Sequence, residues 1–416
     1  MWRIKNFIII KECRTCGSKK LDEILNLGDQ PLANSLLNAR DISKELYFPL
    51  ALVRCDKCST LQLSINVDPK ILFNSYFWVT GTSNSTKAYC ADLARNIMSR
   101  TKISDPKILE IGSNDGTLLS EFEKLGIENL FGVDPAKNVI PKFSNSNVKY
   151  ITEFFTEGYA KELISNFGEF DIVIARNVLS HVPNLNDVVR GISLVLKKEG
   201  VCVIEFHDAN KLMKETQYDS IYHEHTYYHS IKSMAYALSE GDLIPYDGYT
   251  GPISGGSVII FSSHQKKEST SSFKELVKNE ESLGVYEKIN WENFAINAKL
   301  NIESIRKEFQ SLKRTERNVC AFGASARSST LLNAVGLESN VLTGIADNNQ
   351  RKWGQLSPGV HLEIFDPKEI INNNIKTIFI NAFNFEKEIT TQIKEQLNWS
   401  GQVVVPLPNN LRKYEI

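Results

Sequence analysis

The densest group of titratable side chains lies in residues 217–229 and includes Tyr222, His223, Glu224 and His225. Histidine exchanges protons near neutral pH, and a neighbouring carboxylate can fix the tautomer of its ring. In an extended segment, alternation would place His223 and His225 on one face and Tyr222 and Glu224 on the other. The sequence H-E-x-H lacks the i, i+4 histidine spacing of a metalloprotease helix, which argues against a catalytic metal. We therefore expect acid–base chemistry here, against the alternative of a hydrogen-bonded loop with surface histidines.

Four of the seven cysteines form two close pairs, Cys13/Cys16 and Cys55/Cys58, with 38 residues between the pairs. Two thiolates separated by two residues can bind one metal ion from a single turn, and two such turns supply the four ligands of tetrahedral zinc. Gly17, directly after the first pair, suits the backbone of such a turn. Because four thiolates leave no open coordination position, we expect a structural Zn²⁺. The alternative is four unrelated buried cysteines.

A small-residue loop separates an apolar run that ends at Ile111 from a helical pattern, and it reads Glu110-x-Gly112-x-x-x-Gly116. Small residues at a strand-to-helix turn let the backbone approach a ligand, and the helix N-terminus favours a carboxylate or a phosphate. Asp134 ends the next predicted strand, where its carboxylate is placed to accept hydrogen bonds from ribose hydroxyls. The candidate cofactor-binding residues are Glu110, Gly112, Ser113, Asn114 and Asp115 in the loop, and Asp134, Glu153, Phe154 and Asn177 beyond it.

The glycine pattern of this loop distinguishes among nucleoside cofactors. NAD, FAD and S-adenosylmethionine all bind at this kind of turn, but the loop lacks the G-x-G-x-x-G that lets a pyrophosphate approach closely. The run Leu109-Glu-Ile-Gly-Ser-Asn-Asp-Gly116 resembles motif I of class I methyltransferases instead. We expect S-adenosylmethionine, with Glu153 and Phe154 bordering the adenine. A dinucleotide and a turn without a ligand are the alternatives.

A second strand–turn–helix pattern starts at Val319 and contains Gly323, Ser325 and Arg327, with Asp347 at the end of the next predicted strand. This pattern is typical of a nucleotide or phosphate cradle, and the guanidinium of Arg327 is a fork-shaped donor suited to phosphate. Ser325, Arg327 and Asp347 are therefore the candidate substrate-binding residues. The alternative is a degenerate α/β half with only a packing role.

Three segments of different character must position these residues, because 416 residues exceed what one hydrophobic core usually serves. Residues 1–75 hold the cysteine pairs, residues 76–265 alternate strand-like and helical patterns, and residues 266–416 open with a charged helical stretch at about 272–313 before the alternation returns. The predicted strands are residues 107–111, 130–133, 148–151, 171–175, 201–206, 319–322, 342–346, 377–380 and 402–405. We expect an α/β protein with a small zinc-binding N-terminal module, a class I Rossmann-like methyltransferase domain and a second, C-terminal Rossmann-like domain.

Composition and charge exclude several classes of protein. Forty-eight basic and forty-nine acidic residues leave a net charge of −1, so no basic excess favours a nucleic-acid partner. No run of about 18 apolar residues predicts a membrane span, and the short apolar N-terminal run does not resemble a signal peptide. Cys90, Cys202 and Cys320 stand alone, which suits reduced core thiols. A cytoplasmic protein with neither a nucleic-acid nor a membrane partner is expected.

Taken together, the chain resembles the nucleotide-sugar C-methyltransferases of deoxysugar biosynthesis, particularly the C-3' enzymes that act on 4-keto hexoses. The resemblance covers essentially the whole chain, and its combination of motifs is specific. It rests on the cysteine pairs, Leu27-Gly-Asp-Gln-Pro-Leu-Ala-Asn34, the loop at 109–116, Tyr222-His-Glu-His225, Gly323-Ala-Ser-Ala-Arg327, the Asp347-Asn-Asn segment and Pro358-Gly359. Arg327 and Ser328 stand where the family has Lys and Gly, and residues 77–85 match loosely; both departures fall where substrate would be read.

The resemblance implies S-adenosylmethionine as methyl donor and a sugar nucleotide, dTDP-linked or linked to another nucleoside diphosphate, bound between the last two domains. A base removes the proton next to the ketone, and the resulting enolate carbon attacks the S-methyl group. By resemblance, His225 is the first choice as base and Tyr222 a close competitor. Glu224 would orient or polarise the base, and Tyr76 and His181 would contact the sugar or the sulfonium region.

Other functions compatible with the sequence are an NAD-dependent oxidoreductase of nucleotide sugars and an N- or O-methyltransferase of another small molecule. A zinc-ribbon scaffold or a methyltransferase that modifies nucleic acid is a further alternative, against which the balanced charge weighs.

Overall fold

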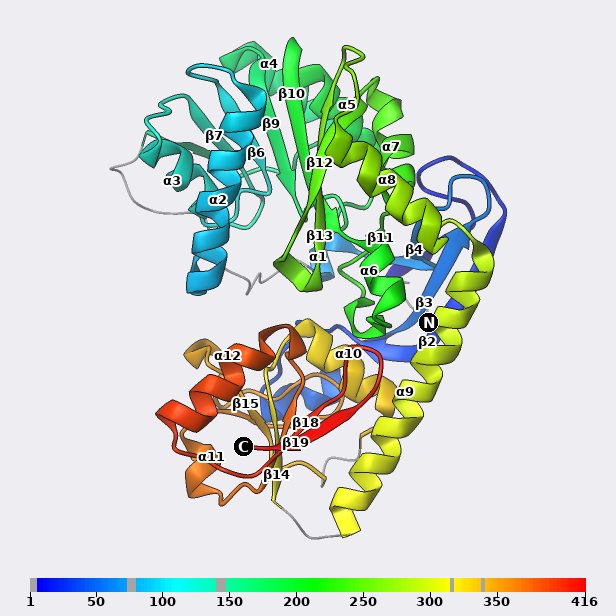
Figure 1. The fold of residues 1–416 in the computed structure, drawn as a ribbon, viewed down its shortest axis with the longest axis vertical. Coiled ribbons are helices and arrows are strands. Elements are labelled where there is room, and N and C mark those ends of the chain that lie inside the picture. Colours follow the sequence, from blue (N-terminus) through cyan, green and yellow to red (C-terminus); the bar gives the residue numbers. More distant parts are fainter. Residues whose placement is uncertain (1–5, 73–79, 140–146, 315–317, 338–340) are drawn as a thin grey trace.

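The computed structural model describes residues 6–72, 80–139, 147–314, 318–337 and 341–416. In these ranges the strands form four sheets, and the two largest belong to separate α/β units at opposite ends of the molecule (Figure 1). The N-terminal module lies beside both units, and a long helix runs along the same side (Figure 1). None of the described helices is both long and apolar enough to cross a membrane.

The N-terminal module is built around a long antiparallel hairpin. Its elements are β1 (Phe7–Ile9), β2 (Leu21–Pro31), η1 (Ala39–Lys44), β3 (Tyr47–Cys55), β4 (Leu61–Leu63), β5 (Ile65–Val67) and α1 (Pro69–Leu72). Strands β1 and β5 pair separately, while the larger sheet has the order β11-β4-β3-β2. Strand β11 (Tyr227–Tyr228) comes from the histidine-rich segment, so this segment is part of the N-terminal module's sheet.

The central sheet has the order β12-β13-β10-β9-β6-β7-β8 in the described residues. Its strands are β6 (Ile108–Ile111), β7 (Leu130–Val133), β8 (Lys149–Ile151), β9 (Phe170–Arg176), β10 (Leu196–His207), β12 (Ile244–Gly251) and β13 (Ser257–Ser263). Strands β8, β7, β6, β9 and β10 are parallel, whereas β13 pairs antiparallel with both β10 and β12. The chain runs outward from β6 through β7 to β8 and returns to β9, which makes the carboxyl ends of β6 and β9 a topological switch point. Ligands of open α/β sheets bind at such a point.

Helices cover both faces of this sheet and give each face its own apolar core. The helices of this unit are α2 (Asn84–Thr101), α3 (Thr117–Lys124), α4 (Glu157–Phe167), α5 (Leu185–Val195), α6 (Ala209–Lys214) and α7 (Ile231–Leu238). The inner strands are buried on both sides, which explains why they read as continuous apolar runs in the sequence.

The charged stretch predicted as one helical connector forms two helices, α8 (Ser271–Leu283) and α9 (Lys288–Arg314). Gly284 ends α8 in the left-handed conformation, with φ of +65°, and so breaks the stretch. Helix α9 is the long helix along the side of the molecule (Figure 1). It contacts β2, α6 and α10 (Ala326–Val335), and thereby joins all three parts of the chain.

The C-terminal sheet has the order β16-β15-β14-β17-β18-β19 where the structure describes it. Its strands are β14 (Val319–Phe322), β15 (Ile345–Ala346), β16 (Ile364–Phe365), β17 (Thr377–Ile380), β18 (Gln402–Val405) and β19 (Arg412–Glu415), and its further helices are α11 (Glu369–Asn372) and α12 (Glu386–Thr391). All neighbouring pairs are parallel except β18 with β19. Strand β14 occupies the position that β6 has in the central sheet, so the second turn also follows the first strand at a switch point.

The predicted strands 319–322, 377–380 and 402–405 have the observed bounds of β14, β17 and β18. The prediction for 342–346 is too long, because only Ile345–Ala346 is paired as β15. The prediction for 201–206 is too short, because β10 begins at Leu196 directly after α5. The α/β class and the zinc-binding N-terminal module are as expected.

Candidate active site

The loop after β6 has a backbone that only small residues can adopt. Gly112 and Gly116 have φ of +70° and +71°, and Asn114 between them has +52°. A Cβ atom at Gly116 would lie 1.8 Å from the hydroxyl oxygen of Tyr150, and one at Gly112 would lie 2.9 Å from Cγ2 of Val178. Both glycines are therefore required by the left-handed backbone and by close packing.

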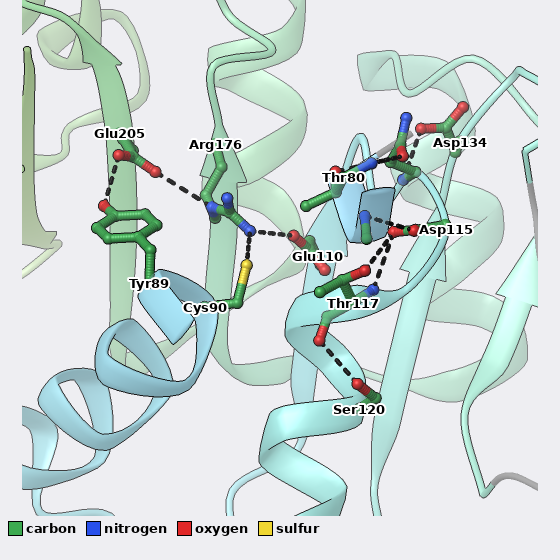
Figure 2. A network of polar contacts seen from close by, with 12 residues as sticks. Thr80, Tyr89, Cys90, Glu110, Asp115, Thr117, Ser120, Asp134, Arg176 and Glu205 are labelled. Carbon is green, nitrogen blue, oxygen red and sulfur yellow. Dashed lines mark hydrogen bonds and ion pairs between the residues drawn. The ribbon is translucent and has the colours of Figure 1, made fainter. Parts of the chain in front are cut away.

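Two other segments hold this loop in place (Figure 2). Asp134, directly after β7, accepts hydrogen bonds from the Asn114 N–H at 2.8 Å through Oδ2 and from the Ala136 N–H at 2.8 Å through Oδ1. Thr80 donates its N–H to Asn114 Oδ1 at 3.0 Å, and Gly81 donates its N–H to Asp115 Oδ2 at 2.8 Å. The short helix η2 (Thr80–Thr82) thus lies against the loop and closes one side of it.

Beneath the loop, two buried carboxylates share one guanidinium (Figure 2). Arg176 lies 3.7 Å from Glu110 (Nη1 to Oε1) and 3.1 Å from Glu205 (Nε to Oε2). Tyr89 on α2 donates to Glu205 Oε1 at 2.5 Å, as does Ser257 at 2.7 Å. Burial raises the pKa of Glu110 to about 8, although Arg176 opposes the shift. The group carries an excess of negative charge when both carboxylates are ionised.

Two buried polar atoms of the loop region could form hydrogen bonds with a ligand. Glu110 Oε2 and Ser113 Oγ are buried and have no hydrogen-bond partner among the described residues. A buried acceptor without a donor is costly, and a bound cationic donor would remove that cost. The ammonium group of S-adenosylmethionine has the charge and the donors that Glu110 lacks, so the residues fit this cofactor.

The remaining predicted cofactor contacts are Asn177, Glu153 and Phe154, and they lie in two separate places. Asn177 follows β9 at the switch point, has φ of +50° and donates its N–H to the Glu205 carbonyl oxygen at 2.7 Å. Glu153 and Phe154 lie beyond β8, and both are exposed, Phe154 by 54%. Their expected contact with the adenine stays a prediction.

The histidine-rich segment is not extended, so the condition for placing His223 and His225 on one face is not met. His225 donates its N–H to the Tyr222 carbonyl oxygen at 2.9 Å, which makes residues 222–225 a turn. The turn brings Tyr222 and His225 together, whereas His223 Nε2 lies 3.3 Å from the Pro49 carbonyl oxygen. His223 packs its ring against Phe48 of the N-terminal module. A local backbone hydrogen bond therefore sets the directions of these side chains, and the alternation of an extended strand does not apply.

Tyr222 and His225 are half-buried and lie in direct contact. The Tyr222 hydroxyl and His225 Nε2 are 2.7 Å apart, and their rings lie 4.0 Å apart between centroids. His225 Nδ1 is 3.2 Å from the carbonyl oxygen of Ser220, which can only accept, so Nδ1 carries the hydrogen and Nε2 has the basic lone pair. Burial lowers the pKa of His225 well below its ordinary value, and the imidazole is therefore neutral.

His181 and Glu224 lie next to this pair. The His181 ring is 4.8 Å from the His225 ring, and its Nδ1 donates to the Glu224 carbonyl oxygen at 2.7 Å. Burial lowers the pKa of His181 to about 4 and raises the pKa of Glu224. Glu224 Oε1 accepts a hydrogen bond from Asn34 Nδ2 at 3.1 Å. The structure thus brings together four of the five predicted catalytic residues; Tyr76 lies outside the described residues.

The turn after β14 repeats the construction of the cofactor loop. Ser325 caps α10 by accepting the Ser328 N–H at 3.2 Å. Asp347 accepts the Ala324 N–H at 2.7 Å and the Asn349 N–H at 2.8 Å, as Asp134 does in the central unit. Lys352 donates to the Ala324 carbonyl oxygen at 2.7 Å. A hollow at this turn is lined by residues of both the C-terminal unit and the N-terminal module, among them Ser325, Ser328, Lys352 and Asn34.

Arg327 crosses to the central unit instead of lining the hollow. Its Nε and Nη2 donate to Asp219 Oδ2 at 2.6 Å and Oδ1 at 2.8 Å, and its guanidinium lies 4.7 Å from the centre of the Phe383 ring. The predicted phosphate contact of Arg327 would have to be made in addition to this ion pair.

The four paired cysteines converge on one point. Their sulfur atoms all lie within 4.8 Å of one another, and Cys13–Cys58 and Cys16–Cys55 are each separated by 3.5 Å. A zinc ion with Zn–S bonds of about 2.3 Å needs sulfur atoms roughly 3.8 Å apart at the corners of a tetrahedron. The four thiolates therefore fit Zn²⁺, as expected.

Several residues of the site escaped sequence reasoning. Asn34, Arg176, Glu205, Asp219 and Lys352 contact the predicted residues through tertiary contacts that link distant segments. The stretch that ends at Asn34 was part of the family resemblance, which was the one available signal for it.

Fold and site together define an S-adenosylmethionine-dependent methyltransferase with a zinc-binding module. Family models match three consecutive regions: a zinc binding domain over residues 13–73, a methyltransferase domain over 83–243 and a C-methyltransferase C-terminal domain over 252–408. These three matches, together with the relative described next, support an S-adenosylmethionine-dependent C-methyltransferase.

Individual proteins are similar to this chain over different lengths. C-methyltransferase NovU of Streptomyces niveus is 28% identical over 403 residues, which cover 96% of each chain. Ubiquinone biosynthesis O-methyltransferase of Azorhizobium caulinodans is 27% identical over 99 residues, or 24% of this chain and 39% of that protein. The solved structure of the PH0226 protein from Pyrococcus horikoshii OT3 is 17% identical and covers 45% of this chain and 95% of its own. Its TM-score is 0.35.

Proposed function

We propose that this C-methyltransferase acts on a nucleotide-linked 4-keto-deoxysugar and adds the methyl group at C-3', next to the ketone. The observation that carries the proposal is the 2.7 Å contact between the Tyr222 hydroxyl and His225 Nε2, which are both half-buried. A carbon acceptor must lose a proton before it can attack, and a neutral imidazole paired with a phenol is suited to accept that proton. The resemblance to sugar C-methyltransferases names the acceptor class.

With the hydrogen of His225 on Nδ1, its Nε2 is free to accept a proton through Tyr222. The Tyr222 oxygen accepts the proton from the carbon beside the ketone while its own proton moves to His225 Nε2. The C–H electron pair then becomes the enolate, which is stabilised by the ketone oxygen. S-adenosylmethionine supplies an electrophilic methyl group when it is bound. His225 ends as an imidazolium whose Nδ1–H still donates to the Ser220 carbonyl oxygen.

The packing around His225 supports the same chemistry. Its ring packs against the rings of Tyr222, His181 and Tyr228, with centroid distances of 4.0, 4.8 and 6.2 Å. Burial lowers the pKa of His225 well below its ordinary value, so the base is in its neutral form at physiological pH. By the family resemblance, Glu224 would orient or polarise the base.

The nucleotide of the substrate is proposed to bind at the turn after β14. The N-terminus of α10 and the ammonium of Lys352 favour phosphate oxygens, and Ser325 and Ser328 offer hydroxyl groups at the same hollow. Thr330 on α10 donates to the Ile221 carbonyl oxygen at 3.2 Å. This hydrogen bond links the helix that follows the turn to the residue directly before Tyr222. A sugar nucleotide can extend from one to the other.

The decisive experiment incubates the purified protein and S-adenosylmethionine with a panel of nucleotide-linked 4-keto-6-deoxy sugars. The expected result is a mass gain of one methyl group on at least one sugar, and exchange of the proton beside the ketone for solvent deuterium. Methylation without any exchange would indicate an oxygen or nitrogen acceptor and overturn the C-3' assignment. Neither methylation nor exchange on any sugar would overturn the substrate class.

A further inference from the structure

The N-terminal zinc module holds the reaction segment by main-chain pairing. Strand β11 pairs antiparallel with β4, with Tyr227 opposite Gln62 and Tyr228 opposite Leu61. Leu63 adds a hydrogen bond from its N–H to the Thr226 carbonyl oxygen at 3.1 Å. The residues that follow His225 are therefore a strand of the zinc module's sheet (Figure 1).

Arg14 connects the first zinc turn to the same residues. It lies between Cys13 and Cys16, and its Nη2 donates to the Thr226 carbonyl oxygen at 3.0 Å and to the Leu63 carbonyl oxygen at 3.2 Å. The guanidinium lies 4.5 Å from the centre of the Tyr227 ring. The position of the zinc turn is thus transmitted to Thr226, one residue after His225, through a single side chain.

Asn34 makes a second connection, on the other side of the turn. Its Nδ2 donates to Glu224 Oε1 at 3.1 Å, while Glu224 Oε2 is buried without a hydrogen-bond partner in the part of the chain described. Asn34 also lines the hollow that contains Ser325 and Lys352. One side chain of the zinc module therefore contacts both the predicted reaction centre and the proposed nucleotide site.

We propose that the zinc module is a working part of the reaction site, in which Asn34 positions Glu224 and Arg14 positions the backbone that carries His225. The chemical part of this inference rests on the proposed function, since it needs Glu224 and His225 to act on substrate. The anchoring part rests on the contacts alone. Zinc then serves the reaction through the geometry of residues 222–228, in addition to folding its own module.

The anchoring is tested without substrate by amide hydrogen exchange. Asn34→Ala and Arg14→Ala are compared with Asn26→Ala and Arg40→Ala, which alter exposed side chains of the same module. Loss of one hydrogen bond should speed exchange of peptides that cover residues 220–229 by about fivefold or more. Peptides that cover the cofactor loop at 108–120, the bound zinc and the affinity for S-adenosylhomocysteine should stay as in the parent protein. Unchanged exchange at 220–229 in both variants would overturn the proposal, even if Arg14→Ala lost its zinc.

The positioning of Glu224 is tested by the pH dependence of turnover. Three groups face Glu224: the Asn34 side chain, the Tyr228 hydroxyl and the His181 ring on its carbonyl oxygen. The Asn34 donor lowers the pKa of the Glu224 carboxyl, whereas burial raises it. The acidic limb of the kcat profile should therefore move to higher pH in Asn34→Ala and further in Asn34→Asp, with the KM for S-adenosylmethionine unchanged.

A merely structural role for Asn34 would lower kcat at every pH and leave the limb in place, which would contradict the proposal. If the parent protein methylates none of the sugars, the proposed substrate fails while the exchange experiment still decides the anchoring.

Discussion

Arg327 and Asp219 form a two-pronged ion pair between the C-terminal unit and the segment that carries the histidines, with N–O distances of 2.6 and 2.8 Å. Asp219 lies three residues before Tyr222, and its side chain is almost completely buried. The pair therefore couples the second α/β unit to the reaction centre. Arg327, which the sequence suggested for phosphate binding, is therefore engaged in an internal ion pair.

Asp219→Ala should destabilise the protein by about 3 kcal/mol, because it leaves the guanidinium of Arg327 buried without its counter-ion. Urea unfolding followed by circular dichroism measures the effect. Glu240→Ala is the matched control: it removes the partner of Arg190 from a surface pair whose two side chains are 38% and 41% exposed, and should cost less than about 1 kcal/mol. Equal effects of the two substitutions would mean that the Arg327–Asp219 pair contributes no more than an exposed one.

Gly116→Ala should abolish measurable cofactor binding, or weaken it by more than about tenfold. The added Cβ would meet the Tyr150 hydroxyl at 1.8 Å, so the loop must move. Gly126→Ala is the control, because Gly126 has φ of +85° but no heavy atom within 4 Å of the added Cβ. Both substitutions should cost about 1 kcal/mol of backbone strain, and only the first should change the affinity for S-adenosylhomocysteine in calorimetry.

The contribution of Glu110 to the stability of the cofactor-free protein should fall as the pH rises from 5 to 8. Burial raises the pKa of Glu110 from 4.5 to about 8. The stabilisation is complete below the unfolded value and is lost as the pH rises through the folded one, with a slope of up to about 1.4 kcal/mol per pH unit. The stability of Glu110→Gln relative to the parent protein should therefore rise with pH over this range, whereas that of Glu268→Gln, at a carboxylate that is 93% exposed, should not change with pH. Parallel slopes in parent and Glu110→Gln protein would contradict the burial argument.

Tyr222→Phe and His225→Asn should each lower kcat by about 10²- to 10⁴-fold, the range for loss of a general base. The affinity for S-adenosylhomocysteine should change little, since the loop at 110–116 is held by hydrogen bonds with Thr80, Gly81 and Asp134. Deuterium exchange beside the ketone should be lost in parallel with methylation. Near-normal turnover of both variants would show that another group removes the proton.

The native protein should contain one zinc ion per chain, and Cys55→Ser should lose it. Elemental analysis measures the metal, and S-adenosylhomocysteine binding should persist because β6 and its loop lie in a separate sheet. Loss of both zinc and cofactor binding would show that the module is required for the central unit to fold. A full complement of zinc in Cys55→Ser would mean that the four thiolates are not the metal site.

Local patterns in the sequence were sufficient for the zinc ligands, the cofactor loop and most strands. The reason is that each depends on neighbours in the chain: two cysteines grip a metal from one turn, Gly112 and Gly116 satisfy a left-handed backbone, and β14 is an apolar run between polar segments. The sequence left the backbone of residues 222–225 open, and the hydrogen bond from the His225 N–H to the Tyr222 carbonyl oxygen makes it a turn.

Only the tertiary structure decided which groups act on one another. Three contacts join residues that are between 29 and 190 positions apart in the chain. They are the ion pairs of Arg176 with Glu110 and Glu205, the hydrogen bond of Asn34 with Glu224, and the ion pair of Arg327 with Asp219. No local periodicity encodes such pairs, because burial and the crossing of separate sheets create them. The sequence by itself determined that the chain binds zinc and carries a methyl-donor loop, and the fold determined that the zinc module reaches the residues proposed to move the proton.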